Sequence, residues 1–277
     1  MKYESNSIVK RIVIIVVISV ACLIQLMPLL IMLNLAFKNV IDKSSKWVPP
    51  TYLYLNNFAN AWIEAELGRA LFNTFVITTF SVLLVVCLGT LASYPLARYP
   101  TRLNNLVYMF SISILIVPPL TILVPLYKVV VDMHGINTPW MLIALHVTFQ
   151  LPFVIFLFTG FIKSIPRDLD EAAIIDGCSR FGVFFHIILP VLKPVTATAM
   201  ILVGLAVWND YQFSLFFLQR PSSQTFTVVL AQFFSQFQNN ISWVAAGSLL
   251  SMIPMTILYI FLQRYFISGL AEGAVKG

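Results

Sequence analysis

The sequence predicts an all-α polytopic membrane protein with six transmembrane helices. The 277 residues are 59% hydrophobic and 10% charged, whereas soluble domains carry about 25% charged residues. The mean hydropathy is +0.89. Six long runs lack Asp, Glu, Lys and Arg apart from a single Asp, and each can cross about 30 Å of hydrocarbon as a helix. This composition excludes a disordered chain, a coiled coil and most soluble enzymes. It also makes the net charge of +6 a signal of membrane topology rather than of nucleic-acid binding.

The six runs are taken in chain order. The first follows Lys10 and Arg11 as a signal peptide would, but it is too long and no Ala-x-Ala site closes it, so we expect it to be retained. The third contains Pro118 and Pro119, which we expect to kink it. The fifth is interrupted only by Asp210. The predicted spans are residues 12–36, 70–94, 104–128, 140–162, 194–217 and 243–263, within a transmembrane domain of residues 12–265.

The basic residues predict the orientation of these spans. With six spans, both ends of the chain lie on the same side of the membrane as the connections after the second and fourth spans. These segments hold eleven of the 17 Lys and Arg, and the three connections on the other side hold six. Because cytoplasmic segments carry the excess of basic residues, we expect residues 1–11 and the tail 266–277 to be cytoplasmic. Four of the six outside charges lie in the connection between the first two spans, which weakens the bias.

The loop at 163–193, between the fourth and fifth spans, carries eight of the chain's 28 charges. Pro166, followed by Asp168 and Glu171 in a capping-box spacing, predicts a short helix over residues 167–176. Gly177 predicts its left-handed end. Ser179 is expected to cap a second short helix that stops at Pro190. An amphipathic hairpin lying on lipid is the alternative, but the four acidic residues of the loop argue against it.

The spacing within this loop resembles a known motif. Glu171-Ala172-Ala173, then Gly177, Ile187 and Leu189-Pro190, is similar to the EAA loop of permeases in ATP-binding-cassette importers. Further segments resemble the carbohydrate permeases of the maltose and multiple-sugar type, in particular the shorter, six-span subunit. These segments are Asn57-Phe58, Phe72-Asn73-Thr74, Trp208-Asn209-Asp210 and the tail from Ser268 to Gly277.

The resemblance implies the type I importer permease fold and a set of partners. These are a second, homologous permease, two copies of a cytoplasmic ATPase and an external solute-binding protein, in a bacterial cytoplasmic membrane. It implies an ATPase-coupling surface and a tail contact with the ATPase at Gly273, Lys276 and Gly277. The implied coupling residues are Glu171, Ala172, Ala173, Asp176, Gly177, Ile187, Leu189 and Pro190.

Catalytic motifs are absent from the sequence. It contains no G-x-x-x-x-G-K-[ST], so a phosphate-cradling P-loop is missing and we expect ATP and Mg²⁺ to bind a partner chain. It contains no H-E-x-x-H, no G-x-S-x-G and no Cys/His cluster. The sequence therefore predicts a non-catalytic subunit without a cofactor of its own and without nucleic acid as a partner.

Polar residues within spans are candidates for the transport pathway, because a charge in the bilayer centre is costly. Asp210 is the one acidic residue in the predicted spans, and an interfacial anchor beside Trp208 and Tyr211 is its alternative interpretation. The pathway candidates are Asn73, Gln150, Trp208, Asn209 and Asp210.

The leading functional hypothesis is a permease subunit of an ATP-driven importer of di- or oligosaccharides. The same type of importer for a polyamine, glycerol phosphate or an amino acid is the second hypothesis. An ion-coupled secondary carrier is the third, although such carriers usually need several carboxylates within the membrane. The sequence alone does not name the sugar.

Overall fold

The computed structural model describes residues 2–236 and 240–274, with side chains over residues 10–236 and 240–263. Every regular element in these residues is a helix, which confirms the predicted all-α class. The chain forms two compact units. The first holds the residues up to Gly68 together with Leu230–Met252, and the second holds Arg69–Val229 together with the residues from Ile253 onward.

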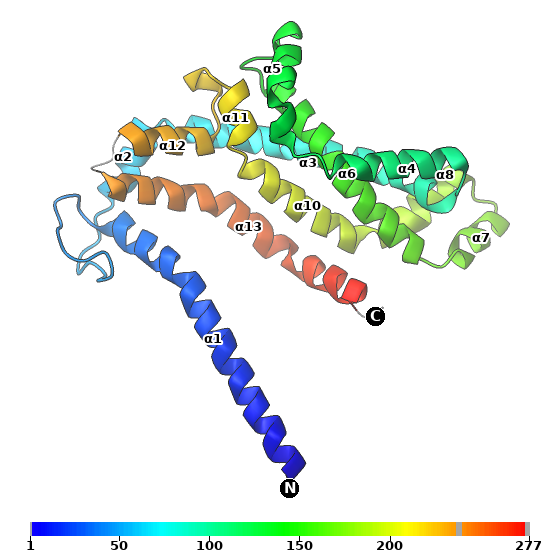
Figure 1. Ribbon diagram of the computed structural model, residues 1–277, viewed down its shortest axis with the longest axis horizontal. Coiled ribbons are helices and arrows are strands. Elements are labelled where there is room, and N and C mark those ends of the chain that lie inside the picture. Colours follow the sequence, from blue (N-terminus) through cyan, green and yellow to red (C-terminus); the bar gives the residue numbers. More distant parts are fainter. Residues whose placement is uncertain (1, 237–239, 275–277) are drawn as a thin grey trace. The chain divides into compact units, whose positions relative to one another are not determined.

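The helices in chain order (Figure 1) are α1 (Lys2–Phe37), α2 (Asn56–Glu64), α3 (Leu67–Arg98), α4 (Arg102–Ile114), the 3₁₀ turn η1 (Pro119–Ile122), α5 (Leu123–Asp132), α6 (Pro139–Ser164), α7 (Asp168–Ile175), α8 (Arg180–Val183), the π-helical η2 (Phe184–Ile188), α9 (Leu189–Val191), α10 (Lys193–Trp208), α11 (Gln212–Phe217), the 3₁₀ turn η3 (Pro221–Ser223), α12 (Phe226–Gln236) and α13 (Ile241–Ala274).

Four of these helices are long and apolar enough, over the described residues, to cross a membrane: α1, α3, α6 and α13. Two bent pairs bring the number to as many as six. Helix α4 meets the η1–α5 segment at 89°, and the α8–α9 segment meets α10 at 70°. The break in the first pair falls just before Pro119, as the proline pair predicts.

The fifth predicted span, residues 194–217, is not one helix. Helix α10 ends at Trp208, residues 209–211 lie outside any helix, and α11 begins at Gln212. The side chain of Asp210 accepts hydrogen bonds from the backbone N–H groups of Phe213 and Ser214. It therefore satisfies the free donors of a new helix start instead of continuing the old one.

The second unit is built around the contact between α3 and α6. A Cβ atom placed on Gly89 would lie 2.5 Å from Cγ1 of Val154, so the two backbones approach more closely there than any larger residue allows. Ser93 Oγ donates to the carbonyl oxygen of Ile155 at 3.3 Å, and Phe158 is fully buried. This close packing holds α3 and α6 together near their C-terminal ends, next to the loop at 163–193.

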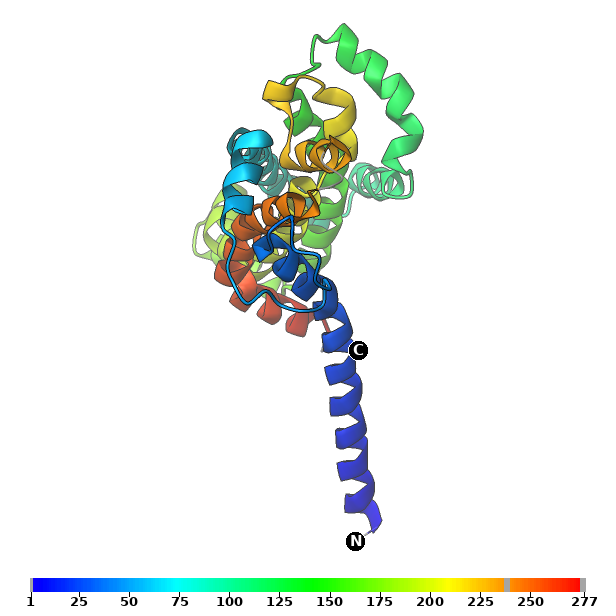
Figure 2. The ribbon, with the colours of Figure 1, turned by 90° about the vertical axis from the view of Figure 1, so that its left-hand side faces the viewer.

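The first unit contains α1, whose apolar surface from Lys10 to Leu30 is not covered by any other residue that the structure describes. All side chains from Lys10 to Leu30 are exposed, along the long blue helix in Figure 2. The C-terminal end of α1 is bound to α2, a helix within the connection that the sequence did not predict. Asn57 is fully buried and its Nδ2 donates to the carbonyl oxygens of Ala36 and Lys38, at 2.8 and 2.7 Å. The amide thereby caps the end of α1.

The connection after α1 has a defined structure of its own. Lys38 is buried and its Nζ donates to Ser44 Oγ at 2.7 Å and to the carbonyl oxygen of Ser45 at 2.6 Å. Tyr52 donates its hydroxyl hydrogen to Asp42 at 2.6 Å. This bond, helped by the donors of Ser44, lowers the pKa of the Asp42 carboxyl to about 2.

Candidate functional site

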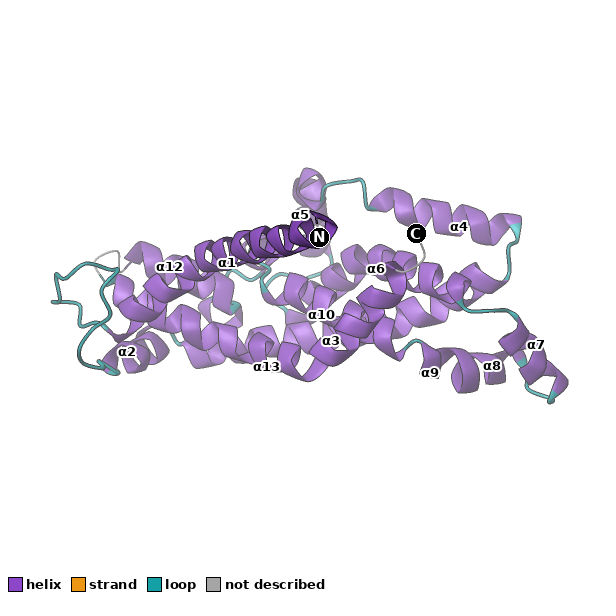
Figure 3. Cartoon of the chain, turned by 90° about the horizontal axis from the view of Figure 1, so that it is seen from below, coloured by secondary structure: helices purple, strands orange, loops and turns teal. Residues whose placement is uncertain are grey.

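The loop at 163–193 forms a compact projection that follows the C-terminal end of α6 in the second unit. Helix α7 occupies the predicted position and projects beyond the end of α6 (Figures 1 and 3). The predicted capping box is wrong. Arg167 occupies the N-cap position in a helical conformation with no side-chain bond, and Asp168 is already the first helical residue. The acidic residues of this first turn therefore act through their charge at the positive end of the helix.

Gly177 ends α7 in the predicted left-handed conformation, with φ of +88°. The amide of Cys178 bonds the carbonyl of Ala173 at 2.9 Å, and the amide of Gly177 bonds that of Ile174 at 3.0 Å. This pattern closes the last turn and reverses the chain direction.

We expect Gly177→Val to weaken coupling by distorting this reversal. The space around a Cβ at this position is empty, so the cost is backbone strain of about 1–2 kcal/mol. Gly160→Val is the matched control, because Gly160 also has open space but lies within α6. Gly177→Asn should retain function, since Asn tolerates this conformation. The measurement is solute uptake by the importer that the resemblance implies, and equal uptake by the two Val variants would contradict the prediction.

The second short helix begins as predicted but does not stop where predicted. Ser179 Oγ accepts a hydrogen bond from the amide of Gly182 at 3.2 Å, which caps α8. The chain then stays helical through the π-helical η2 and past Pro190 to Val191. Pro190 lies at the beginning of α9, where a missing N–H costs little, and this placement explains why it does not end the helical segment.

The predicted coupling residues divide between two faces. Glu171, Ala172, Asp176, Gly177 and Pro190 are exposed, and Ile187 and Leu189 are half-buried. Ala173 is buried within this chain, which corrects its assignment to the contact surface. On the eight-residue α7, Ala173 shares the inward face with Asp170, three residues earlier.

Three large apolar side chains lie exposed on the same projection. Ile175 is 85% exposed, Phe181 77% and Ile174 52%. An exposed apolar group flanked by charged residues is typical of a protein-binding surface. The exposure of Ile174 and Phe181 depends on how the two short helices fold against each other, so the sequence alone does not predict it.

Of the pathway candidates, Asn73 has a structural role. Its Nδ2 donates to the carbonyl oxygens of Ser222 and Gln224, both at 3.0 Å. It thereby ties the turn after α11 to the beginning of α3. Gln150 is half-buried on α6, and Asn209 is exposed and bonds the carbonyl of Leu205 in the helix that it ends.

Asp210 holds the break between α10 and α11. One carboxyl oxygen accepts from the amide and hydroxyl groups of Ser214, at 2.9 and 2.8 Å. The other accepts from the amide of Phe213 at 3.2 Å. The buried ring of His146 lies 3.8 Å away. Thr227 donates to the backbone carbonyl of Asp210 at 2.6 Å. The carboxyl group is therefore already engaged by this chain's own donors.

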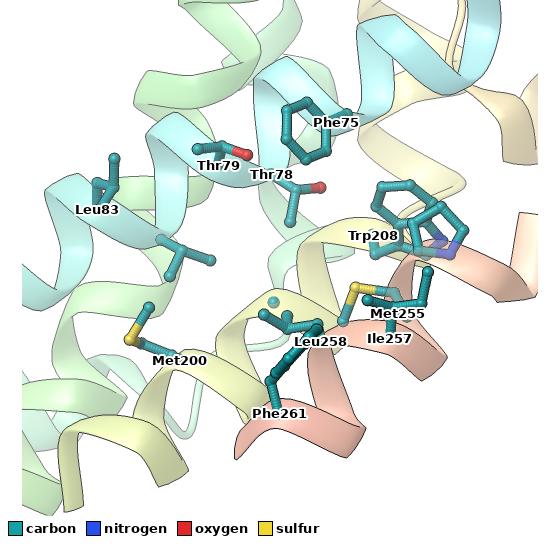
Figure 4. A pocket seen from close by; sticks show the side chains of 13 residues that line it. Phe75, Thr78, Thr79, Leu83, Met200, Trp208, Met255, Ile257, Leu258 and Phe261 are labelled. Atoms are coloured by element: carbon teal, nitrogen blue, oxygen red, sulfur yellow. The ribbon is translucent and has the colours of Figure 1, made fainter. Parts of the chain in front are cut away.

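Trp208 is the pathway candidate that borders a cavity. The cavity measures about 310 Å³ and lies between α3, α10 and α13 (Figure 4). Its walls are almost entirely apolar and include Phe75, Thr78, Met200, Trp208, Leu258 and Phe261. The hydroxyl of Thr78 is buried there without a hydrogen-bond partner. Sugar hydroxyl groups need several such partners, so this cavity does not by itself form a complete sugar site.

The predicted tail contact lies mostly beyond the structure. Lys276 and Gly277 are outside the described residues, and Gly273 belongs to the last turns of α13. Helix α13 runs on to Ala274 and so includes the greater part of the predicted tail 266–277. Within the described residues, no group of three or more His, Cys, Asp or Glu side chains is placed to hold a metal ion.

Comparisons with known proteins identify relatives over nearly the whole chain. Residues 85–272 match the family of binding-protein-dependent transport system inner membrane components. The melibiose/raffinose/stachyose import permease protein of Bacillus subtilis is 47% identical over 96% of this chain and 97% of its own. The multiple sugar-binding transport system permease protein of Streptococcus mutans is 33% identical over 94% of this chain and 95% of its own.

A solved structure shares the fold. A chain of a bacterial ABC transporter involved in the import of the acidic polysaccharide alginate superposes with a TM-score of 0.81 at 18% identity. The match covers 94% of this chain and 98% of that chain. The chain thus has the type I importer permease fold. The chain belongs to the family of binding-protein-dependent transport system inner membrane components, and it is a permease of the carbohydrate-importer type.

Proposed function

We propose that this chain is one of two permease subunits of an ATP-driven importer for α-galactosides such as melibiose and raffinose. The 47% identity with the melibiose/raffinose/stachyose permease, over 96% of the chain, is the observation that carries this proposal. An identity of this size over the full length supports a shared substrate class more strongly than the fold does. The other curated relatives extend the class to oligosaccharides in general.

A separate ATPase is proposed to supply the energy. The sequence has no P-loop, so the phosphates of ATP have no cradle here. The outward face of α7 presents Glu171 with Ala172 and Ile175, all exposed. A small residue between a carboxylate and an aliphatic side chain suits insertion of α7 into a cleft with a basic residue. ATP and Mg²⁺ then bind the ATPase, and this chain remains non-catalytic.

The remaining partners follow from surfaces and relatives. The bare apolar surface of α1 needs either lipid or another membrane helix around it, and a second permease supplies such a helix. One related alginate transporter has been solved in complex with a periplasmic protein loaded with an alginate pentasaccharide, which supports a solute-binding protein here. The ATPase must contact α7 in the cytoplasm, so α7 and both termini lie on that side, in agreement with the distribution of Lys and Arg.

Uptake by reconstituted vesicles tests the proposal. Vesicles containing this chain with its second permease, the ATPase and the solute-binding protein should accumulate radiolabelled melibiose and raffinose. Accumulation should require ATP inside the vesicles and persist with an uncoupler. Competition by spermidine, glycerol phosphate or an amino acid, but not by raffinose, would favour the other importer classes. Uptake that the uncoupler abolishes would point to an ion-coupled carrier and overturn the proposal.

A further inference from the structure

Arg98 connects the projecting loop to the spans. It is the last residue of α3, and its side chain is 5% exposed. Asp170 lies in the first turn of α7 with its side chain 13% exposed. Arg98 Nε lies 2.8 Å from Oδ2 of Asp170 as an ionic contact, and Nη2 donates a hydrogen bond to Oδ1 at 3.1 Å.

The same guanidinium holds a third element. Arg98 Nη1 donates to the carbonyl oxygen of Ile165 at 3.0 Å. Ile165 is the C-cap residue of α6 and has extended backbone, so its carbonyl is not used by the helix. One side chain thus joins the end of α3, the end of α6 and the beginning of α7. The planar, forked guanidinium suits this task because its donors have fixed directions.

The aromatic residues beside Arg98 attach the second half of the loop to the same place. Tyr94, one turn earlier on α3, packs its ring 5.3 Å from that of Phe184 in η2 and 6.1 Å from that of Tyr99. The guanidinium of Arg180, at the beginning of α8, lies 5.2 Å from the centre of the Tyr99 ring. Both halves of the loop therefore contact residues at, or directly after, the C-terminal end of α3.

Helix α7 consequently has one face turned to the spans and one turned outward. Asp170 and Ala173 face inward and are buried, whereas Glu171 and Ile175 are exposed. A force on the outward face of α7 is transmitted through the ion pair between Asp170 and Arg98 to the ends of α3 and α6.

A buried ion pair is poorly explained by stability alone. Replacing such a pair with well-packed apolar residues is often neutral or stabilising, because both charges lose their hydration on burial. What an apolar pair does not reproduce is directional bonding among three backbones.

We propose that Arg98 is a positioning residue for coupling. Its guanidinium fixes α7 to the ends of α3 and α6, so that displacement of α7 by the ATPase moves the two spans together. The inference rests on the proposed coupling role of α7.

The test separates this role from a merely structural one. The reconstituted importer is prepared with the double substitution Arg98→Met and Asp170→Leu, and melibiose uptake and ATP hydrolysis are measured in the same vesicles. The double variant should assemble and keep its melting temperature. Its uptake per ATP hydrolysed should fall by about fivefold or more, the lower bound of typical coupling between sites. Arg98→Lys keeps the charge but not the fork, and it should give a smaller fall.

The matched control is the double substitution Arg102→Met and Asp132→Leu, which makes the same chemical changes at two exposed positions. It should couple like the unmodified chain. Normal uptake per ATP in the Arg98→Met/Asp170→Leu variant would overturn the proposal. If that variant does not assemble, the result for Arg98→Lys decides between the two roles. Normal uptake per ATP in Arg98→Lys would reject the positioning role, and so would failure of Arg98→Lys to assemble. Lack of ATP-dependent melibiose uptake by the unmodified importer would instead refute the proposed function.

Discussion

Replacing Glu171 with Lys is expected to lower sugar uptake by more than about tenfold, the usual scale for losing one partner of a buried charge pair at an interface. Glu171 is exposed in the first turn of α7, where a carboxylate is available to a basic residue of the ATPase. A lysine at this position repels that residue. The measurement is uptake in vesicles together with the amount of ATPase that co-purifies with the permease.

Asp168→Lys is the control for an effect on the helix itself. Asp168 is also exposed in the first turn of α7, so both substitutions oppose the helix dipole by about 0.3–1 kcal/mol. We expect the Asp168 variant to retain most uptake. Equal losses in the two variants would show that the charge of the turn matters rather than a contact of Glu171. Normal uptake by the Glu171 variant with bound ATPase would refute the contact.

Replacing Asp210 with Ala is expected to destabilise the permease by about 2 kcal/mol and to abolish most uptake. The substitution leaves the hydroxyl of Ser214 and the amides of Phe213 and Ser214 without their acceptor. The melting temperature of the purified complex and sugar uptake are the two measurements. Asp132→Ala, at an exposed Asp on α5, is the control and should change neither.

Asp210→Asn distinguishes the two roles considered for this residue. Asn also caps helix starts well, so the break between α10 and α11 should survive and uptake should remain. A residue that contacts the passing sugar through its carboxylate would lose uptake in the Asn variant while the melting temperature stays unchanged. That result would restore Asp210 to the transport pathway.

Local signals in the sequence were sufficient for the long apolar helices α1, α3, α6 and α13, the short helix α7 and its glycine end. Long apolar runs, a proline pair and a glycine after a polar helix each act within a few residues. The signals failed where distant segments meet. Asp170 looked like one more acidic residue on a solvated face, because its partner Arg98 lies 72 positions earlier. Ala173 looked equivalent to Ala172 until the packing of α7 gave them opposite faces.

The pathway candidates show the same limit. Asn73 and Asp210 attracted interest as polar residues among apolar ones, and both are engaged by backbone groups of this chain. The partners of Asp210 lie three and four positions later, at a helix start that the continuous apolar run did not predict. For Asn73 the acceptors lie about 150 positions away. The hydrogen-bonding needs of a broken helix are a local effect, but which side chain satisfies them depends on the tertiary fold.

The separation of Arg98 from Asp170 also has a consequence for biosynthesis. At about 5–20 residues per second, the ribosome needs about 4–14 s to make the 72 residues between them. During this time α3 is complete while the carboxylate partner of its terminal arginine has not yet been made. The ion pair that holds the loop at 163–193 therefore forms only after α6 has been synthesised, which makes docking of this loop a late step in the folding of the chain. A chain that stops before Asp170 lacks this connection between α3, α6 and α7.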